Sequence, residues 1–565
     1  MTLLKHKKFI FLAGILLFLF LVSNAYAANV GDIVNFNIEK SFDVSNRDRA
    51  PSSLVKITNS LYFYIEKSWW DAQTPQKQED ILTSLNSLSD EFDSNIYPKL
   101  TSTFGFEMSP GIDGDRKITV LFTPMNSAEG GYFNTADEYE KLQITTSNER
   151  EMVYLSVDEL GTSQAKVVLA HEFMHLITFN QKNKIFDIED DTWLNEARAD
   201  YSSTFLGYDD VYEGSNLQQR VRDFVANPTD SLTEWTGTKY DYAIANLFAH
   251  YLVDHYGISV LAESLKSKYI GVSSINYALS RLSLKDDFKK IFTNWTIASV
   301  INNCSTNTNY CYLNGNLKSL RISPTLNFLP ITGNVSLSVA NVTKNWQGNW
   351  LKFIGGNGDL ELGFSGLKGL NFQVPYIIED SSGSQTIKML TLDEDQKGKI
   401  SVANFGKDYK SIIIIPSLQS EISSAVGEGT SYPFTYSVSI TGEEASGEQA
   451  LIQKLLDQIA YLKAEIAKLL GYPVDQQTVC GQLNTNLSMG DSGSSVKCLQ
   501  TFLKSQGSDI YPEGLVTGYF GNLTKAAVTK FQQKYASEIL SPLGLSYGTG
   551  YVGALTRVKI NQLGG

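Results

Sequence analysis

The chain has 565 residues, too many for one hydrophobic core, so we expect several domains. Its 60 acidic side chains against 47 Lys and Arg give a formal net charge of −13. This balance argues against a nucleic-acid-binding protein, because such binding requires Lys and Arg to neutralise phosphates.

The first 27 residues have the pattern of a secretory signal peptide. Lysines precede an apolar run over residues 9–22, and Ala25-Tyr26-Ala27 follows as a small-x-small cleavage site. The run, at about 14 residues, is short for a membrane span. We expect cleavage after Ala27 and an extracytoplasmic protein with no later membrane span. An uncleaved N-terminal anchor is the alternative.

Residues 28 to about 160 are predicted to form a lobe with a mixed sheet. Residues 61–65, 117–122 and 152–157 are rich in the β-branched and aromatic side chains typical of strands. Residues 78–97 have apolar side chains at helical spacing. Asp113-Gly114-Asp115 lacks the later ligands of a calcium loop, so we expect a turn there.

The next segment, from Ser163, is predicted to be a helix that Ser163 caps, and it contains His171-Glu172-Phe173-Met174-His175. Histidines at i and i+4 lie on one face of a helix, so both imidazoles can bind one metal ion. Glu172 lies beside the first histidine, where a carboxylate can take a proton from a metal-bound water. This spacing predicts a catalytic zinc helix.

A second motif follows, Asn195-Glu196-Ala197-Arg198-Ala199-Asp200. Glu196 can supply a third ligand and leave the fourth zinc position open for water, as catalytic sites require. Between the motifs runs an acidic segment, Asp187, Glu189, Asp190 and Asp191. We expect a solvated loop there, with calcium as the weaker alternative.

Together the two motifs resemble those of gluzincin metallopeptidases, especially the hyicolysin-like group, over roughly residues 30–320. One departure is Ala199, where thermolysin-like members have Ser. The resemblance implies that His171, His175 and Glu196 bind one zinc ion and that Glu172 is the general base. It also implies that Asp200 orients His171 and that Asn195 supports His175.

The resemblance implies a helical lobe behind the zinc helix, and residues 243–256 and 278–302 have helical patterns. Gluzincins often stabilise the oxyanion with a Tyr or His that follows the third ligand. Tyr242 is our candidate, with Tyr240 as the alternative, and an ordinary packing tyrosine remains open. The α+β zincin-like peptidase domain would span residues 28–322.

Residues 323–442 contain short alternating strands and Gly-rich turns, which predict an antiparallel β-sandwich. The predicted strands include residues 335–339, 350–353, 411–416 and 434–440. No chemistry is evident in this domain, so we expect an accessory role in binding or spacing.

Residues 447–471 follow with apolar side chains at 3-4 spacing, which predicts a short amphipathic helix. Such a helix could pair with another chain as a coiled coil or lie on a neighbouring domain. The exported chain has four cysteines in two local pairs, and we expect the disulfides Cys304–Cys311 and Cys480–Cys498.

Residues 478–565 are predicted to be a small helical bundle with Gly-rich turns. Leu487-Ser488-Met489-Gly490-Asp491, Thr517-Gly518-Tyr519-Phe520-Gly521 and the helix starting near Thr524 resemble a three-helix peptidoglycan-binding domain. Such a domain would hold the chain at the bacterial cell wall.

These features predict a secreted, wall-held zinc endopeptidase that cuts protein or peptide substrates. One alternative is a hydrolase of peptidoglycan stem peptides. A second is a wall-bound adhesin with an inactive protease fold. The cleavage preference cannot be read from these motifs.

Overall fold

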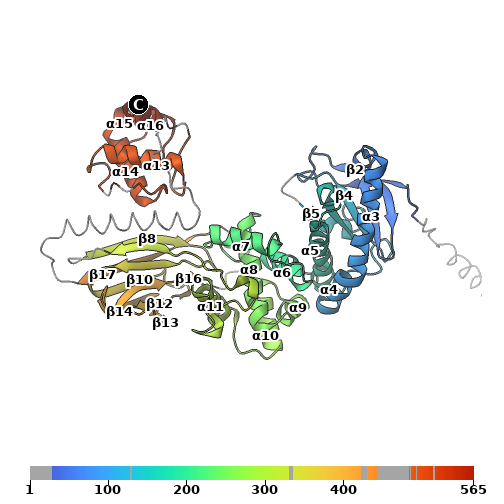
Figure 1. Ribbon diagram of the computed structural model, residues 1–565, viewed down its shortest axis with the longest axis horizontal. Helices are drawn as coiled ribbons and strands as arrows, with labels where there is room; N and C mark the ends of the chain where they lie inside the picture. The colour runs from blue at the N-terminus through green and yellow to red at the C-terminus, as the bar shows by residue number, and fades with distance from the viewer. Residues whose placement is uncertain are drawn as a thin grey trace, which may run out of the picture. The chain divides into compact units, whose positions relative to one another are not determined.

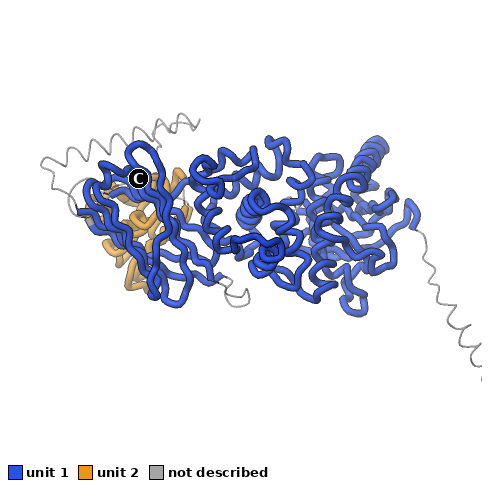
Figure 2. The backbone as a smooth tube through the Cα atoms, turned by 90° about the horizontal axis from the view of Figure 1, so that it is seen from below, with its two compact units in different colours: residues 1–446 blue, residues 447–565 orange. Residues whose placement is uncertain are grey.

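A computed structural model describes residues 28–126, 130–329, 335–420, 429–441 and 483–564, the last range without residues 484, 492, 513 and 515. The chain forms two compact units, residues 1–446 and 447–565 (Figure 2). The predicted signal peptide and the amphipathic helix of residues 447–471 lie outside the described residues. No helix in the described ranges is both long and apolar enough to cross a membrane.

The first lobe contains a six-stranded sheet in the order β1-β2-β3-β4-β6-β5. Its strands are β1 Ile33–Asn37, β2 Arg49–Ile57, β3 Leu61–Glu66, β4 Ile118–Thr123, β5 Gly131–Tyr132 and β6 Met152–Ser156. β3, β4 and β6 run parallel, and β5 pairs antiparallel with β6 at the edge of the sheet. The predicted mixed sheet is therefore confirmed.

Alternate side chains of the sheet enter two different cores, because successive residues of a strand point to opposite faces. On one face, Leu61, Phe63 and Ile65 pack with the helices in the largest core cluster. On the other face, Tyr64 joins Leu121 and a smaller cluster. The helices of this lobe are α2 Lys67–Asp71, α3 Pro75–Glu91, α4 Tyr97–Phe104 and α5 Gln164–Phe179 (Figure 1).

The start of α5 differs from the prediction in one detail. Ser163 occupies the N-cap position, but its side chain makes no capping hydrogen bond. The Thr162 hydroxyl instead accepts a hydrogen bond from the Gln164 N–H at 3.1 Å. The backbone of Ser163 is already helical, so its side chain does not reach the first turn as a cap does.

The helical lobe follows with α6 Thr192–Phe205, α7 Asn216–Ala226, α8 Lys239–Tyr256, α9 Ser259–Leu265, α10 Gly271–Arg281 and α11 Phe288–Ile301. α8 begins earlier than predicted because Thr238 and Asp241 form a capping box. The single helix predicted for residues 278–302 is wrong. Asp287 accepts a hydrogen bond from the Lys290 N–H and starts α11 separately from α10.

The remaining strands of the first unit are β7 Thr325–Leu329, β8 Val335–Thr343, β9 Leu351–Gly355, β10 Gly358–Ser365, β11 Phe372–Gln373, β12 Pro375–Asp380, β13 Gln385–Met389, β14 Lys397–Phe405, β15 Tyr409–Ile414, β16 Ser417–Leu418 and β17 Tyr432–Thr441. One ladder runs β13-β12-β15-β9-β7 and another runs β14-β10-β17-β8. Inward side chains of both ladders, such as Ile412 and Val438, share one core. The two ladders are joined into one nine-stranded sheet by a single parallel pair, Phe405 with Tyr409. Because β7 and β9 are also parallel, the predicted antiparallel sandwich is matched only in part.

The sandwich packs on the helical lobe through buried contacts. The Trp350 Nε1–H donates to the Thr296 carbonyl at 2.8 Å. Trp346 packs edge-on against Phe288 and Phe292 at ring distances of 4.7 and 5.3 Å. These aromatic side chains belong to the same core cluster as the helices of the helical lobe.

The C-terminal unit contains α13 Ser494–Ser505, α14 Asn522–Lys534, α15 Ala536–Ile539 and α16 Ala554–Gly564. Its core includes Val496 and Leu499 of α13, Val528 and Phe531 of α14, and Ile560 of α16. The predicted helical bundle with turns between the helices is therefore present.

Candidate metal centre

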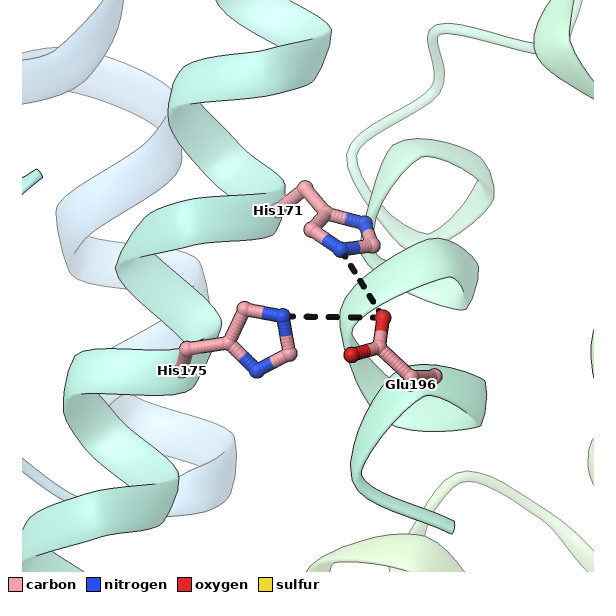
Figure 3. A group of neighbouring side chains, drawn as sticks. All are labelled: His171, His175 and Glu196. Atoms are coloured by element: carbon pink, nitrogen blue, oxygen red, sulfur yellow. Dashed lines mark ion pairs between the residues drawn. The ribbon is translucent and has the colours of Figure 1, made fainter. Parts of the chain in front are cut away.

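The two predicted motifs lie on adjacent helices whose side chains meet. His171 and His175 are one turn apart on α5, and Glu196 projects from α6 toward them (Figure 3). The Glu196 Oε2 lies 3.2 Å from the His171 Nε2 and 3.6 Å from the His175 Nε2. Their ligand atoms all lie within 4.8 Å of one another, the only such group among the described residues.

This donor set fits a zinc ion. Two imidazole nitrogens and one carboxylate oxygen are three of the ligands that catalytic zinc accepts. The Glu196 Oε2 is buried and makes no hydrogen bond within the described part of the chain. Its nearest polar neighbours are the two imidazole nitrogens, so a cation shared by the three groups would balance its buried charge.

Electrostatics at the centre also favour a cation. Burial disfavours charge on His175, but the Glu196 carboxylate outweighs burial and raises the pKa of His175 to about 9. Burial likewise opposes charge on Glu196, yet the two imidazoles hold the pKa of Glu196 well below its usual range. The carboxylate is therefore ionised, as a metal ligand must be.

Asn195 lies where the prediction expected it. Its Oδ1 is 3.1 Å from the His175 Nδ1. The Nδ1–H is donated to this oxygen, so Nε2 is the ring nitrogen that faces Glu196. Asn195 thus orients one imidazole.

Asp200 has different partners from those expected. Its carboxylate accepts hydrogen bonds from the Arg220 Nε at 2.8 Å and Nη2 at 2.9 Å, and from the Asn216 Nδ2 at 2.9 Å. Burial alone would raise the pKa of Asp200, but Arg220 lowers it, and His171 is close enough to add to that effect. Asp200 therefore interacts with His171 electrostatically, and the donors of its hydrogen bonds lie on α7.

Glu172 faces the edge strand of the sheet. It is only 5% exposed. A Cβ added to Gly131 of β5 would lie 3.4 Å from the Glu172 Cγ. The Glu172 side chain therefore lies between α5 and β5.

Of the two candidate tyrosines, Tyr242 is the one that interacts electrostatically with Glu196 and Glu172. Burial first, and then the negative charges of Glu196 and Glu172, raise the pKa of Tyr242 well above its usual value. Tyr240 instead lies near Lys239, whose Nζ is 5.3 Å from the Tyr240 ring centroid. A tyrosine phenol is protonated at neutral pH, and the raised pKa of Tyr242 keeps it so at higher pH, where it can still donate a hydrogen bond.

The loop between the two ligand helices is held by a buried charge cluster that the sequence did not reveal. Asp190 Oδ2 lies 2.8 Å from the Arg198 NH1 and 3.7 Å from the Lys182 Nζ. Asp190 Oδ1 accepts a hydrogen bond from the Gly271 N–H at 2.8 Å. Both oxygens of Asp190 already have partners, so this member of the acidic segment offers no unpaired oxygen to calcium.

Two further predictions concern local structure. Asp113-Gly114-Asp115 forms the expected turn, in which the Gly114 N–H donates to the Gly111 carbonyl. The disulfide Cys304–Cys311 is formed just after α11. The second predicted pair, Cys480–Cys498, includes Cys480, which lies outside the described residues.

Comparison with known families supports the C-terminal prediction. Residues 492–538 match a family model described as a putative peptidoglycan-binding domain. The match covers too little of the chain to place the whole chain in a family. Comparison with curated proteins returned no match.

Among solved structures, similar chains include the Yersinia pseudotuberculosis-derived mitogen, at 6% identity, TM-score 0.15, 20% of this chain and 92% of that one. The pre-peptidase C-terminal domain of a Bacillus anthracis collagenase has 7% identity, TM-score 0.14, and coverage of 20% and 96%. The Aeromonas hydrophila lysozyme inhibitor PliG has 12% identity, TM-score 0.15, and coverage of 21% and 100%. Likenesses this weak carry no functional argument.

Proposed function

We propose that the chain is a zinc-dependent endopeptidase held at the cell wall by its C-terminal domain. The observation that carries this proposal is the meeting of His171, His175 and the buried carboxylate of Glu196, whose ligand atoms all lie within 4.8 Å of one another. When bound, zinc would supply Lewis-acid polarisation of the scissile carbonyl and of water. The wall-binding part rests on the family match at residues 492–538.

The side chains around the centre would supply the other catalytic groups. Glu172 takes a proton from the attacking water and passes it to the leaving amine, as general bases do in peptide hydrolysis. The protonated Tyr242 phenol donates a hydrogen bond to the oxyanion that develops on the former carbonyl. Asn195 keeps the His175 imidazole in the required tautomer.

The substrate would extend the sheet. β5 is the terminal strand in the order β4-β6-β5, so its outer edge is the one nearest Glu172 that can pair with another strand. An extended peptide at such an edge gains main-chain hydrogen bonds with little demand on its sequence. The substrate would pair with β5 and not with β6, because β6 already pairs with a strand on each side.

The test is Glu172→Gln. We expect this variant to bind one zinc ion per chain by metal analysis but to hydrolyse casein roughly 10²–10⁴-fold more slowly, because the general base is lost. His175→Ala serves as the comparison variant and should lose zinc as well. Casein hydrolysis at the wild-type rate by Glu172→Gln would refute the mechanism.

The family match favours one second candidate, a hydrolase of peptidoglycan stem peptides. It would use the same residues on a different substrate. Muropeptide analysis after digestion of purified sacculi separates the two. New peptide ends in sacculi with casein uncut would favour this candidate, and cleaved casein with unchanged muropeptides would exclude it.

A further inference from the structure

The C-terminal unit contains one structural motif twice, 32 residues apart. A turn of sequence Thr517-Gly518-Tyr519-Phe520-Gly521 recurs as Thr549-Gly550-Tyr551-Val552-Gly553. Each turn precedes a helix, α14 in the first copy and α16 in the second (Figure 1). Each turn is also hydrogen-bonded to a buried glutamine of an earlier helix, Gln500 on α13 and Gln532 on α14.

The glutamine contacts agree almost atom for atom. The Gln500 Nε2 donates to the Tyr519 carbonyl at 2.8 Å and to the Thr524 hydroxyl at 2.9 Å. The Gln500 Oε1 accepts from the Gly518 N–H at 2.8 Å. In the second copy, Gln532 makes the corresponding bonds to Tyr551, Thr556 and Gly550 at 2.7, 3.0 and 2.9 Å. Two turns with the same buried support have the same backbone shape.

The tyrosines of the two turns are presented in the same way. Each tyrosine N–H donates to the preceding threonine hydroxyl at 3.1 Å. Each ring lies beside the glycine two residues later, because a Cβ on Gly521 or Gly553 would lie 3.6 or 3.2 Å from its edge. Tyr519 is 55% and Tyr551 45% exposed. The support is buried, and the rings reach solvent.

We propose that Tyr519 and Tyr551 are two equivalent contact sites for the glycan strand of peptidoglycan. This inference rests on the wall-binding part of the proposed function. The family match contains the first turn but ends at residue 538, before the second. A tyrosine ring offers an apolar face and a hydroxyl, which suits a sugar ring with an apolar face and polar edges.

The repetition itself points to a polymer. A glycan strand presents the same unit many times, so one strand can contact both turns at once. The second contact is then intramolecular, and the combined affinity exceeds that of either turn alone. A ligand that occurs as a single small unit would gain nothing from the duplication.

The test uses the full-length protein and co-sedimentation with purified sacculi. We expect Tyr519→Ala and Tyr551→Ala each to weaken binding roughly ten-fold, and the double variant roughly a hundred-fold. Tyr547→Ala is the matched control. Tyr547 is 78% exposed in the same unit, but the equivalent sequence position in the first copy is Leu515, so this tyrosine is not repeated. This control should bind like the wild type.

The other possible results contradict either the two-site inference or the proposed wall attachment. If only Tyr519→Ala weakens binding, or if Tyr547→Ala weakens it equally, the two-site inference is wrong. If the wild type sediments with sacculi and the double variant does so equally, the inference fails but the wall attachment stands. If the wild type does not sediment, both fail. Casein hydrolysis and thermal melting of each variant show that the fold is intact.

Discussion

Arg220 contacts two residues of the candidate metal centre, Asp200 and Tyr242, that are about 20 positions away from Arg220 in the sequence. Its guanidinium binds Asp200 through two hydrogen bonds and lies 4.9 Å from the centroid of the Tyr242 ring. A paired guanidinium is rigid, and its attraction to the ring face helps to hold the phenol in place. The position of Tyr242 therefore depends on α7 as well as on its own helix.

The role of Tyr242 can be tested by Tyr242→Phe, with Tyr240→Phe as the control. Loss of one oxyanion donor costs about 10²-fold in kcat, because that hydrogen bond strengthens only in the transition state. We therefore expect a lower kcat with a nearly unchanged KM for casein-derived peptides. Tyr240→Phe should leave both constants unchanged, and a reversed pattern would assign the oxyanion to Tyr240.

For individual residues of the site, local sequence spacing predicted more contacts than long-range pairing did. The meeting of His171 and His175 follows from helix geometry alone, since residues four apart share a face. Lys182, Arg198 and Arg220 were missed because their partners come from other helices or from a loop, and basic residues are common on surfaces. Asp200 was expected beside His171, but a fully charged guanidinium is its stronger partner.

The position of β5 depends on the absence of a side chain at Gly131. A Cβ on Gly131 would lie 2.6 Å from both the Tyr154 carbonyl oxygen and the Val168 Cγ1. The glycine therefore lets the edge strand approach both β6 and α5. This close approach brings the strand to Glu172.

Gly131→Ala should consequently lower both stability and activity. Overpacking of this kind costs about 1–3 kcal/mol of the free energy of unfolding, because the strand or the helix must shift. Urea unfolding measures the first effect and kcat/KM on casein measures the second. Gly315→Ala is the control, because an added Cβ there meets nothing within 4 Å. Full activity of Gly131→Ala would show that β5 does not position the substrate.

The elements were predicted well where a pattern repeats and poorly at their ends. β17 alternates buried and exposed residues, and this alternation is visible in the sequence. The break between α10 and α11 was missed because apolar side chains continue through both helices, while the cap that separates them is one residue, Asp287. The 32-residue repeat is visible in the sequence as the Thr-Gly-Tyr-x-Gly turn at residues 517–521 and 549–553, because self-similarity is a direct signal of repeated structure.

At the scale of the whole molecule, the contacts of Trp350 imply that the sandwich and the helical lobe unfold together. Trp350→Ala removes a buried side chain and its hydrogen bond to the Thr296 carbonyl, at a cost of about 3–5 kcal/mol. Calorimetry should show a lower Tm for the transition of the first unit and an unchanged transition for the second.

Leu326→Ala is a suitable control, because Leu326 is 49% exposed on β7 of the same sandwich. It should leave both transitions in place. A separate sandwich transition in the wild type would contradict the shared unfolding, since two units that unfold independently give two heat absorptions.

The overlap of the two copies in the C-terminal unit also bears on how such a domain can change size. α14 follows the turn of the first copy and carries the glutamine of the second, so neighbouring copies share a helix. A tandem duplication of 32 residues would append a turn and a helix to a surface that already fits them, as in other repeat proteins. Lengthening by whole copies thus requires no newly evolved interface, whereas cutting within α14 would damage both copies at once.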